Sequence, residues 1–376
     1  GASYWRYGLD QMGAGAKAKN IMLAVLPGDS QPGADLTSRS TLPLMDCERL
    51  RSYLTAGGRP NAVKFLNYCR HLLDGTGNPG PAEPLQPVGV YRDTRDQHEF
   101  ASGIIFYRSV IEGAQTAPID ALVDALAERG IGCAAIFVSS LKDVASAAFV
   151  QETLAERKPS LLLNATSFAT SSGDPLAAYD CPVLQVILAS GTENNWRNSA
   201  QGLGSRDLAM NVVLPELDGR IHSRAISFKS DSHFHEATQC RISTYKPVGD
   251  RVTYVADLAA NWVGLRHAPA SERKAAIVLA NYPNKDGRIA NGVGYDTPAS
   301  TIAILRAMQA MGFDTGELPS NGNDLIFSLA SSRHRDANAL ELDVYRRQFS
   351  LVPSKVREII SSQWGIPETD PSCRQG

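Results

Sequence analysis

Short apolar runs alternate with amphipathic stretches through the middle of the chain. Apolar runs lie at residues 102–107, 133–138, 161–163 and 182–187, and each is typical of a buried strand. Between the first two runs, Ile119, Leu122, Val123 and Leu126 recur at helical spacing and form one apolar face. Short apolar strands joined by amphipathic helices pair in parallel and carry helices on both faces of the sheet. The pattern therefore predicts a doubly wound, flavodoxin-like or Rossmann-like α/β domain.

Changes in composition divide the first part of the chain. Residues 1–74 combine an apolar run at 21–26 with two helical stretches, which predicts an N-terminal α/β segment. Between Gly75 and Gly89, eight of fifteen residues are Gly or Pro. Because both residue types break helices and strands, residues 75–89 are predicted to be a linker.

The remaining chain is expected to form two units. The Rossmann-like domain should occupy residues 90–245. A helix at 251–264, an apolar run at 275–280 and a helix at 298–311 predict a second α/β unit over 246–376. We expect this second unit to be truncated.

Composition narrows the classes of function. Hydrophobic residues make up 43% and charged residues 20%, which excludes a wholly disordered chain, a coiled coil and a collagen-like fibre. The net charge of -2 gives no global field for a phosphate backbone, so nucleic acid is not expected as a partner. Six Cys in a chain of this length do not form a disulfide framework. With no apolar run that could span a bilayer and no signal peptide, we expect a cytoplasmic chain without a membrane partner.

The segment 281–298 is the strongest candidate for ligand binding. It follows the predicted strand at 275–280, where open α/β sheets bind their ligands, and it exceeds the roughly 2–6 residues usual for such a connection. Its side chains offer positive charge and amide hydrogen bonds, and Thr297 and Pro298 suit the start of the next helix. The candidate residues are Asn281, Tyr282, Asn284, Lys285, Arg288, Asn291 and Asp296. The alternative is an ordered surface loop held by its own Asn and Gly turns.

Polar residues also follow three strands of the first α/β domain. Arg108 follows the first strand, Asn164 to Ser167 lie past the third, and Glu193 and Trp196 come after the fourth. In a parallel sheet all of them would line one crevice, and we count Arg108, Glu193 and Trp196 as candidate substrate-binding residues. The alternative is turn chemistry and helix capping, which Asn, Thr and Ser supply in any fold.

The sequence contains little evidence for a cofactor or metal site. The chain has no Gly-x-x-x-x-Gly-Lys-Ser/Thr loop, and Gly13-Ala14-Gly15 lacks the third glycine of a dinucleotide fingerprint, so neither ATP nor NAD is expected to bind. His233 and His235 could be two ligands on one face of a strand, but a solvated polar loop is the preferred interpretation. We predict no metal site and identify no catalytic residue.

Several segments together resemble the aerobic cobaltochelatase large subunit. The segment Asn281-Tyr282-Pro283-Asn284-Lys285-Asp286-Gly287-Arg288, continuing to Pro298, resembles a signature loop of that family. The other similar segments are 3–8, 105–109, 116–122, 137–143 and 163–166, together with 215–219, which the large subunit of the related magnesium chelatase shares. The resemblance covers nearly the whole chain in the same order.

The resemblance implies a role in cobalamin (vitamin B12) biosynthesis. The family's large subunit binds a tetrapyrrole, here expected to be the corrin precursor hydrogenobyrinic acid a,c-diamide. It inserts cobalt, which is a substrate, as a ligase that forms nitrogen–metal bonds. Two smaller ATPase-type subunits use ATP and Mg, so the missing phosphate loop agrees with that division of labour. No cofactor is expected on this chain itself.

The resemblance also has a departure and two alternatives. Family members are far longer and carry a His-Gly segment further along, whereas none of the seven His here is followed by Gly. We therefore expect an amino-terminal fragment that is inactive alone. One alternative is magnesium-chelatase H, which binds protoporphyrin IX, although the Asn-Lys-Asp-Gly-Arg run favours cobalt. The other is a non-catalytic, two-lobed module that binds a small ligand.

Overall fold

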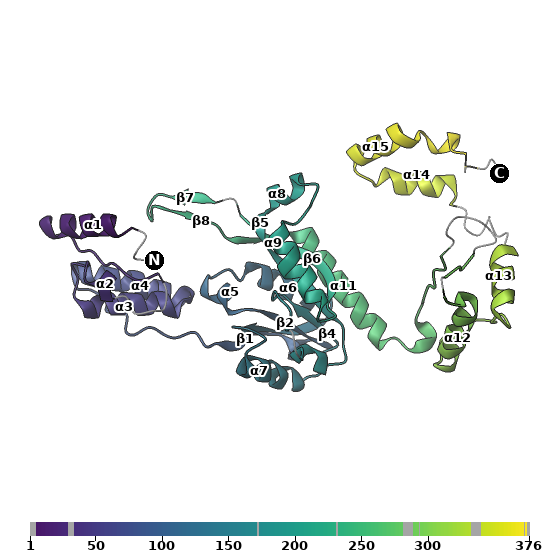
Figure 1. Cartoon of the computed structure of the whole chain (residues 1–376), viewed down its shortest axis with the longest axis horizontal. Coiled ribbons are helices and arrows are strands. Elements are labelled where there is room, and N and C mark those ends of the chain that lie inside the picture. The colour runs from purple at the N-terminus through teal and green to yellow at the C-terminus, as the bar shows by residue number, and fades with distance from the viewer. Residues whose placement is uncertain are drawn as a thin grey trace. The chain divides into compact units, whose positions relative to one another are not determined.

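The computed structural model describes residues 5–28, 34–170, 173–230, 232–280, 289–292, 294–331, 340–371 and 373. The chain forms two compact units, Gly1–His267 and Ala268–Gly376 (Figure 1). The boundary follows helix α11 (Gly249–His267), which the sequence pattern places at the start of the second unit. The helix belongs to the first unit because Val252, Val255 and Ala259 are buried in the same core as the sheet.

A mostly parallel sheet organises the first unit. Its seven described strands lie in the order β1-β3-β2-β4-β5-β6-β9. Their bounds are β1 Val88–Asp93, β2 Phe100–Tyr107, β3 Ile131–Val138, β4 Leu161–Asn164, β5 Val183–Thr192, β6 Ile221–Lys229 and β9 Tyr245–Pro247. The strands from β3 to β6 pair in parallel, and β1 and β9 add antiparallel edges. The prediction of an α/β fold with a mostly parallel sheet is confirmed.

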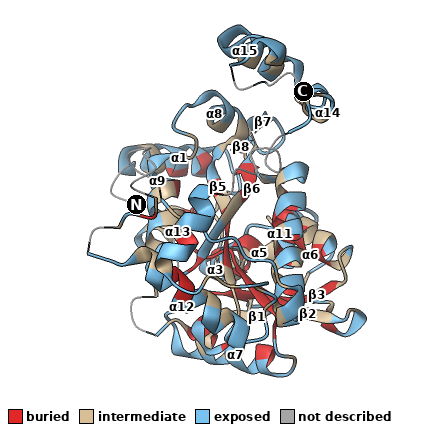
Figure 2. Ribbon diagram, turned by 90° about the vertical axis from the view of Figure 1, so that its right-hand side faces the viewer, coloured by how far each residue is buried: buried red, intermediate tan, exposed pale blue. Residues whose placement is uncertain are grey.

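Helices cover both faces of this sheet. On one face, α6 (Ala117–Ala127) and α11 pack against the apolar side chains of β2, β3 and β4. On the other face, α7 (Val144–Ala155) and the short helix η2 (Pro175–Ala178) enclose a second core. Buried residues follow the strands in Figure 2, and every residue of β3 is buried. A strand covered on both faces needs an unbroken apolar run, which explains the pattern read from the sequence.

Helices before the sheet, short helices between its strands and one hairpin complete the first unit. The helices before the sheet are α1 Arg6–Ala18, α2 Ala34–Thr37, α3 Leu44–Ala56 and α4 Gly58–Asp74. The others are η1 Arg95–Gln97, α5 Arg108–Glu112, α8 Glu193–Asn198, α9 Ser205–Leu208, the π-helical η3 Ala209–Val213 and α10 Leu214–Glu216. An exposed hairpin pairs β7 (His233–His235) with β8 (Cys240–Ile242).

The predicted strand at 21–26 is wrong, because these residues pair with no strand in the described part of the chain. The amide of Leu23 instead donates to Thr41 Oγ1 at 2.7 Å, and the amide of Val25 donates to Ser40 Oγ at 2.8 Å. Side-chain oxygens thus satisfy the backbone donors that a ladder would otherwise take. The described regular structure of residues 5–74 is helical.

The second unit is helical where it is described. Its elements are η4 Ala270–Glu272, α12 Thr297–Ala310, α13 Gly322–Ser331, α14 Leu342–Ser350, α15 Ser354–Trp364 and η6 Pro367–Thr369. The predicted helix at 298–311 is confirmed as α12, but Asp296 rather than Thr297 caps it, accepting from the amide of Ala299 at 3.0 Å.

The predicted strand at 275–280, and with it the α/β character of this unit, is wrong for the described residues. Residues 275–280 carry no strand, and Val278 is 90% exposed. A strand needs a neighbour that pairs its backbone groups along its length, whereas in the described part of this unit the run is joined at its end, where the amide of Ala290 donates to the carbonyl of Ala280 at 2.9 Å. No described helix combines the length and apolar character needed to cross a membrane.

Candidate functional site

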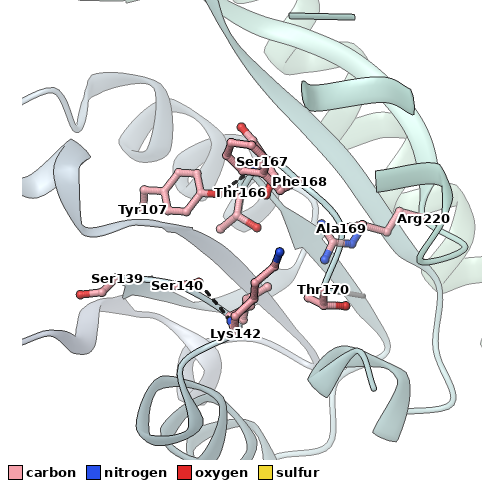
Figure 3. A pocket seen from close by; sticks show the side chains of 11 residues that line it. Tyr107, Ser139, Ser140, Lys142, Thr166, Ser167, Phe168, Ala169, Thr170 and Arg220 are labelled. Atoms are coloured by element: carbon pink, nitrogen blue, oxygen red, sulfur yellow. Dashed lines mark hydrogen bonds between the residues drawn. The ribbon is translucent and has the colours of Figure 1, made fainter. Parts of the chain in front are cut away.

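A pocket opens where the chain reverses its direction of travel across the sheet. After β2 the chain continues to β3 on one side, whereas after β4, which lies on the other side of β2, it continues away to β5, so the connections that leave β2 and β4 run in opposite directions. Open α/β sheets bind ligands at this kind of switch point. The pocket has a volume of about 380 Å³. Its lining consists of Tyr107, Ser139–Lys142, Thr166–Thr170 and Arg220 (Figure 3).

Arg220 is the most buried charged group of this pocket. Its side chain is 1% exposed and lies just before β6. The Nη2 atom is 3.0 Å from Asp218 Oδ2, and the Nε atom is 3.8 Å from Asp174 Oδ2. Asp218 also accepts from the amide of Thr170, at 2.9 and 3.2 Å from its two oxygens. The guanidinium and its carboxylates therefore tie the loop after β4 to the start of β6.

Asp174 also caps the N-terminus of η2. Its Oδ1 atom accepts from the amide of Leu176 at 3.1 Å. Burial raises the pKa of Asp174 above its ordinary value, while the amide bond and the charge of Arg220 oppose that rise. The carboxylate thus depends on Arg220 for part of its stabilisation in the ionised form.

A buried network of amides fixes the start of the loop after β4. Asn164 Nδ2 donates to the carbonyl of Thr166 at 3.0 Å and to Gln185 Oε1 at 2.8 Å. Gln185 Nε2 donates to the same carbonyl at 2.8 Å, and Thr166 Oγ1 donates to Asn164 Oδ1 at 2.8 Å. These partners hold the loop rigidly and leave the network little capacity for a ligand.

Tyr107 supports the next residue of that loop. Its hydroxyl donates to the carbonyl of Ser167 at 2.9 Å and accepts from the amide of Ser167 at 3.1 Å. Burial raises the pKa of Tyr107, so the phenol stays protonated as a donor. The ends of β2 and β4 therefore meet at one pocket, as the sequence predicts for a parallel sheet.

Arg108 is engaged by the protein itself. Its Nε and Nη2 atoms donate to the carbonyls of Gln86 and Leu85, each at 2.9 Å, and its Nη1 atom pairs with Glu112. Arg108 thus anchors the predicted linker beside α5. A substrate that bound Arg108 would have to replace these partners.

Glu193 and Trp196 lie beyond the end of β5, away from the Arg220 pocket. Glu193 lines a separate pocket of about 300 Å³ with Lys229 and Lys246, and it accepts from Arg197 Nη2 at 2.6 Å. Trp196 stacks against Phe228 with ring centroids 5.1 Å apart. The residues expected in one crevice therefore line separate pockets.

The segment 281–298 is described only in part. Asn281, Tyr282, Asn284, Lys285 and Arg288 lie outside the described residues. Asn291 and Asp296 line an open hollow of about 600 Å³ together with Ala290 and Tyr295.

His233 and His235 are the two histidines that the sequence offered as possible metal ligands. They lie on the exposed β7–β8 hairpin, where His235 Nδ1 is 2.8 Å from Thr238 Oγ1. Across the described residues, no group of three His, Cys, Asp or Glu side chains could hold a metal ion. The solvated interpretation of these histidines is consistent with this geometry.

Sequence reasoning missed Lys142, Thr170 and Arg220 as pocket residues. Lys142 ends the segment after the strand at 133–138, and Arg220 directly precedes the apolar run of β6. A charged residue at a strand end was the available signal. Nothing local indicated that the amino end of β6 would approach the loop that follows β4.

Comparison with known proteins places this architecture in a family. A family model described as CobN/Magnesium Chelatase matches residues 51–375. The aerobic cobaltochelatase subunit CobN of a Sinorhizobium species is 40% identical over all of this chain, and that of Pseudomonas aeruginosa is 36% identical over all of it. The magnesium-chelatase H protein of Rhodobacter capsulatus is 26% identical over 66% of the chain and 21% of its own length.

A solved structure agrees with these sequence matches. The catalytic subunit of cobaltochelatase from Mycobacterium tuberculosis has a TM-score of 0.78 and 25% identity, covering 98% of this chain and 32% of that protein. The chain likewise spans 32% of the length of each of the two CobN relatives. The sequence match extends over most of the chain, and the fold agrees with it: this chain belongs to the CobN/magnesium chelatase family.

Proposed function

We propose that the chain is part of the large, tetrapyrrole-binding subunit of an ATP-dependent cobaltochelatase. In this proposal the whole enzyme inserts cobalt into hydrogenobyrinic acid a,c-diamide during aerobic cobalamin biosynthesis. The observation that carries it is the similarity to two CobN subunits along the full chain, compared with a weaker and shorter similarity to magnesium-chelatase H. We further propose a cytoplasmic enzyme in which two smaller subunits hydrolyse ATP.

The chemistry of insertion defines what this chain contributes. Metal insertion removes the ring N–H protons and the water shell of the metal ion, so the enzyme needs a base and a path for cobalt. The described residues contain no cluster of metal-ligating side chains. We propose that this portion of the subunit contributes to substrate binding.

The fold supports a more specific assignment. The parallel strands follow the order β3-β2-β4-β5-β6, in which the first strand of the set in sequence, β2, lies between the second and the third. This is the order of a flavodoxin-like doubly wound sheet, whose ligands bind at the switch point. We propose that the first unit contains such a domain, preceded by the Gly/Pro-rich linker 75–89.

Two regions are proposed to contact the macrocycle. The first is the segment Asn281 to Asp296, because its amides and cations suit the acid and amide substituents of a corrin precursor. The second is the strand-end edge that carries Arg108, Glu193 and Trp196. Since these three side chains are held by internal contacts, we give the first region the larger share.

The test is a titration of the chain with hydrogenobyrinic acid a,c-diamide, followed by corrinoid absorption. Lys285→Ala and Arg288→Ala should each weaken binding by roughly tenfold or more, since a hydrogen bond to a charged group contributes about 1.5–3 kcal/mol. Lys355→Ala, on α15, is the matched control for loss of one positive charge and should leave affinity unchanged. A dissociation constant that neither loop substitution alters would remove this segment from the binding site.

The family similarity leaves magnesium-chelatase H as a second candidate. This alternative predicts tighter binding of protoporphyrin IX than of the corrin precursor, so the same titration with both macrocycles separates the two. If neither macrocycle binds but a sugar or amino acid does, the small-ligand module becomes the better interpretation.

A further inference from the structure

The Arg220 pocket contains buried hydrogen-bond donors for which the described residues supply no acceptor. The Arg220 side chain is 1% exposed, yet its Nε and Nη2 atoms have no hydrogen-bond partner in the described part of the chain. Thr170 Oγ1, on the loop facing Arg220, is buried without a partner as well. Leaving a buried donor unsatisfied destabilises the folded state, so each such group in a native protein calls for an acceptor.

The neighbouring carboxylates do not remove this requirement. Asp174 Oδ2 lies 3.8 Å from Nε, beyond hydrogen-bond distance, and Asp218 Oδ2 lies 3.0 Å from Nη2 as an ion pair without a hydrogen bond. Both Asp218 oxygens already accept from the amide of Thr170. The two carboxylates therefore balance the charge of Arg220 and fix its position, and neither is among the residues that line the cavity.

Lys142 adds a cation on the other side of the cavity. Its ammonium group makes no ion pair or hydrogen bond with the described residues, whereas its backbone amide donates to Ser140 Oγ at 3.1 Å. Figure 3 shows the Lys142 side chain rising into the space between the loop after β3 and the loop that carries Thr170. Lys142 thus brings an unbalanced positive charge to the cavity, and Arg220 brings buried N–H donors to it from a separate element.

Most other polar groups in the lining are already engaged. Tyr107 and Thr166 donate to partners within the protein, Ser167 Oγ donates to Asn211 Oδ1 at 2.6 Å, and Ser139 Oγ donates to the carbonyl of Pro87 at 2.8 Å. The free hydrogen-bonding capacity of the described lining is therefore dominated by donors. A donor-lined, cationic cavity is complementary to a group that only accepts hydrogen bonds and carries negative charge.

We propose that this pocket binds a single oxyanion group, a carboxylate or a phosphate, through Arg220, Thr170 and Lys142. Its volume of about 380 Å³ is near the lower end of the range for small-molecule sites, which suits one acidic group or a short acidic arm. The carboxylate source, an acid side chain of the macrocycle, rests on the proposed function. The phosphate source does not depend on it.

The test measures binding of inorganic phosphate and of acetate by isothermal titration calorimetry, with both anions at equal ionic strength and each series run at low and at high salt. Thr170→Val keeps the shape of the side chain and removes its donor, and it should weaken binding of both anions by roughly tenfold. Lys142→Gln should weaken binding about threefold at low salt, with a smaller effect at high salt because exposed charges are screened. Ser139→Ala removes a lining hydroxyl whose donor is already used, so it is the matched control and should bind as the wild type does.

Two results would overturn the proposal. One is a wild-type chain that binds neither phosphate nor acetate. The other is a folded Thr170→Val variant, with the circular dichroism spectrum of the wild type, that binds both anions unchanged.

A third titration, with hydrogenobyrinic acid a,c-diamide, identifies the source of the oxyanion. If Thr170→Val weakens macrocycle binding by the same factor as it weakens anion binding, the pocket is assigned to an acid side chain of the ring. Weaker phosphate binding with unchanged macrocycle affinity assigns it to a separate phosphate compound. If the wild type binds phosphate but no macrocycle, the proposed function fails while the oxyanion site stands.

Discussion

Replacing Arg220 with Met should sharply destabilise the first unit. The substitution keeps a side chain of similar length and leaves Asp174 and Asp218 without their cation, although their side chains are only 9% and 8% exposed. Removing one partner of a buried ion pair costs roughly 3–5 kcal/mol, because the remaining charge is neither hydrated nor compensated. That range is a large share of the total stability of a typical domain.

The matched control is Arg92→Met in the same unit. Arg92 Nη1 lies 3.2 Å from Asp120 Oδ1, and both side chains are 33% exposed. Water can hydrate Asp120 once Arg92 is gone, so this variant should lose at most about 1 kcal/mol. The difference between the two variants isolates burial from the loss of one arginine.

The pH dependence provides a second check with a definite sign. Burial already raises the folded-state pKa of Asp174, and the charge of Arg220 opposes that rise. Removing Arg220 should therefore raise this pKa further above its unfolded value. A raised folded pKa favours the folded state at low pH, and this advantage is lost as pH rises through the folded pKa. The deficit of Arg220→Met relative to wild type should thus shrink as the pH is lowered.

The assay is urea unfolding followed by tryptophan fluorescence at about pH 7 and about pH 5. Trp364 belongs to the second unit and should be replaced with Phe, so that the emission comes from Trp residues of the first unit such as Trp196. A loss below about 1 kcal/mol at neutral pH would refute the reasoning about buried charge. A deficit that stays constant with pH would refute the role given to Asp174.

Two substitutions and one labelling experiment test other parts of the first unit. Gly132→Ala would place a Cβ atom 2.5 Å from the carbonyl oxygen of Thr94, so it should cost at least about 1–3 kcal/mol in a denaturant melt. Asp143→Ala removes the N-cap of α7, a carboxyl whose pKa is lowered by hydrogen bonds from Ser146. The stabilisation that this cap supplies is present above the ordinary Asp pKa of 3.8 and is lost as pH falls through the lower folded value, so the advantage of the wild type over the variant should vanish in acid unfolding. Burial raises the pKa of the Cys133 thiol to about 12, so iodoacetamide at mildly alkaline pH should spare it in the folded protein and label exposed Cys240, as peptide mass spectrometry would show.

The buried strands of the first unit were predictable because their pattern is local. The apolar runs at 102–107 and 133–138 became β2 and β3, and the helical spacing around Leu122 became α6. A strand that is covered on both faces must be apolar throughout, so its own sequence reports its environment.

Two apolar runs were misleading for a related reason. The runs at 21–26 and 275–280 have strand-like composition, but the described structure gives them no strand partner. Composition indicates that a segment suits a pleated surface, whereas a strand exists only when a neighbouring segment pairs with it. That neighbour is a property of the assembled fold.

The pocket residues also divide into those that a local sequence pattern predicted and those that only the assembled fold brings together. Ser167 was expected at the strand-end edge of the sheet, because parallel strands end together there, and it lines the pocket. Arg220 and Thr170 are 50 positions apart in the sequence, and only the packing of the β6 entry against the loop after β4 brings them to one cavity.

The sequence alone determined the α/β class, the parallel pairing, the family and the edge of the sheet at which polar groups gather. Each follows from short-range periodicity or from motifs that are read in order along the chain. The tertiary structure decided which of those polar groups keep free hydrogen bonds. Arg108 donates hydrogen bonds to nearby carbonyls, whereas Arg220 is buried beside two carboxylates and keeps N–H donors without an acceptor among the described residues. Whether a donor is satisfied depends on directions and distances between distant segments, and no local pattern encodes them.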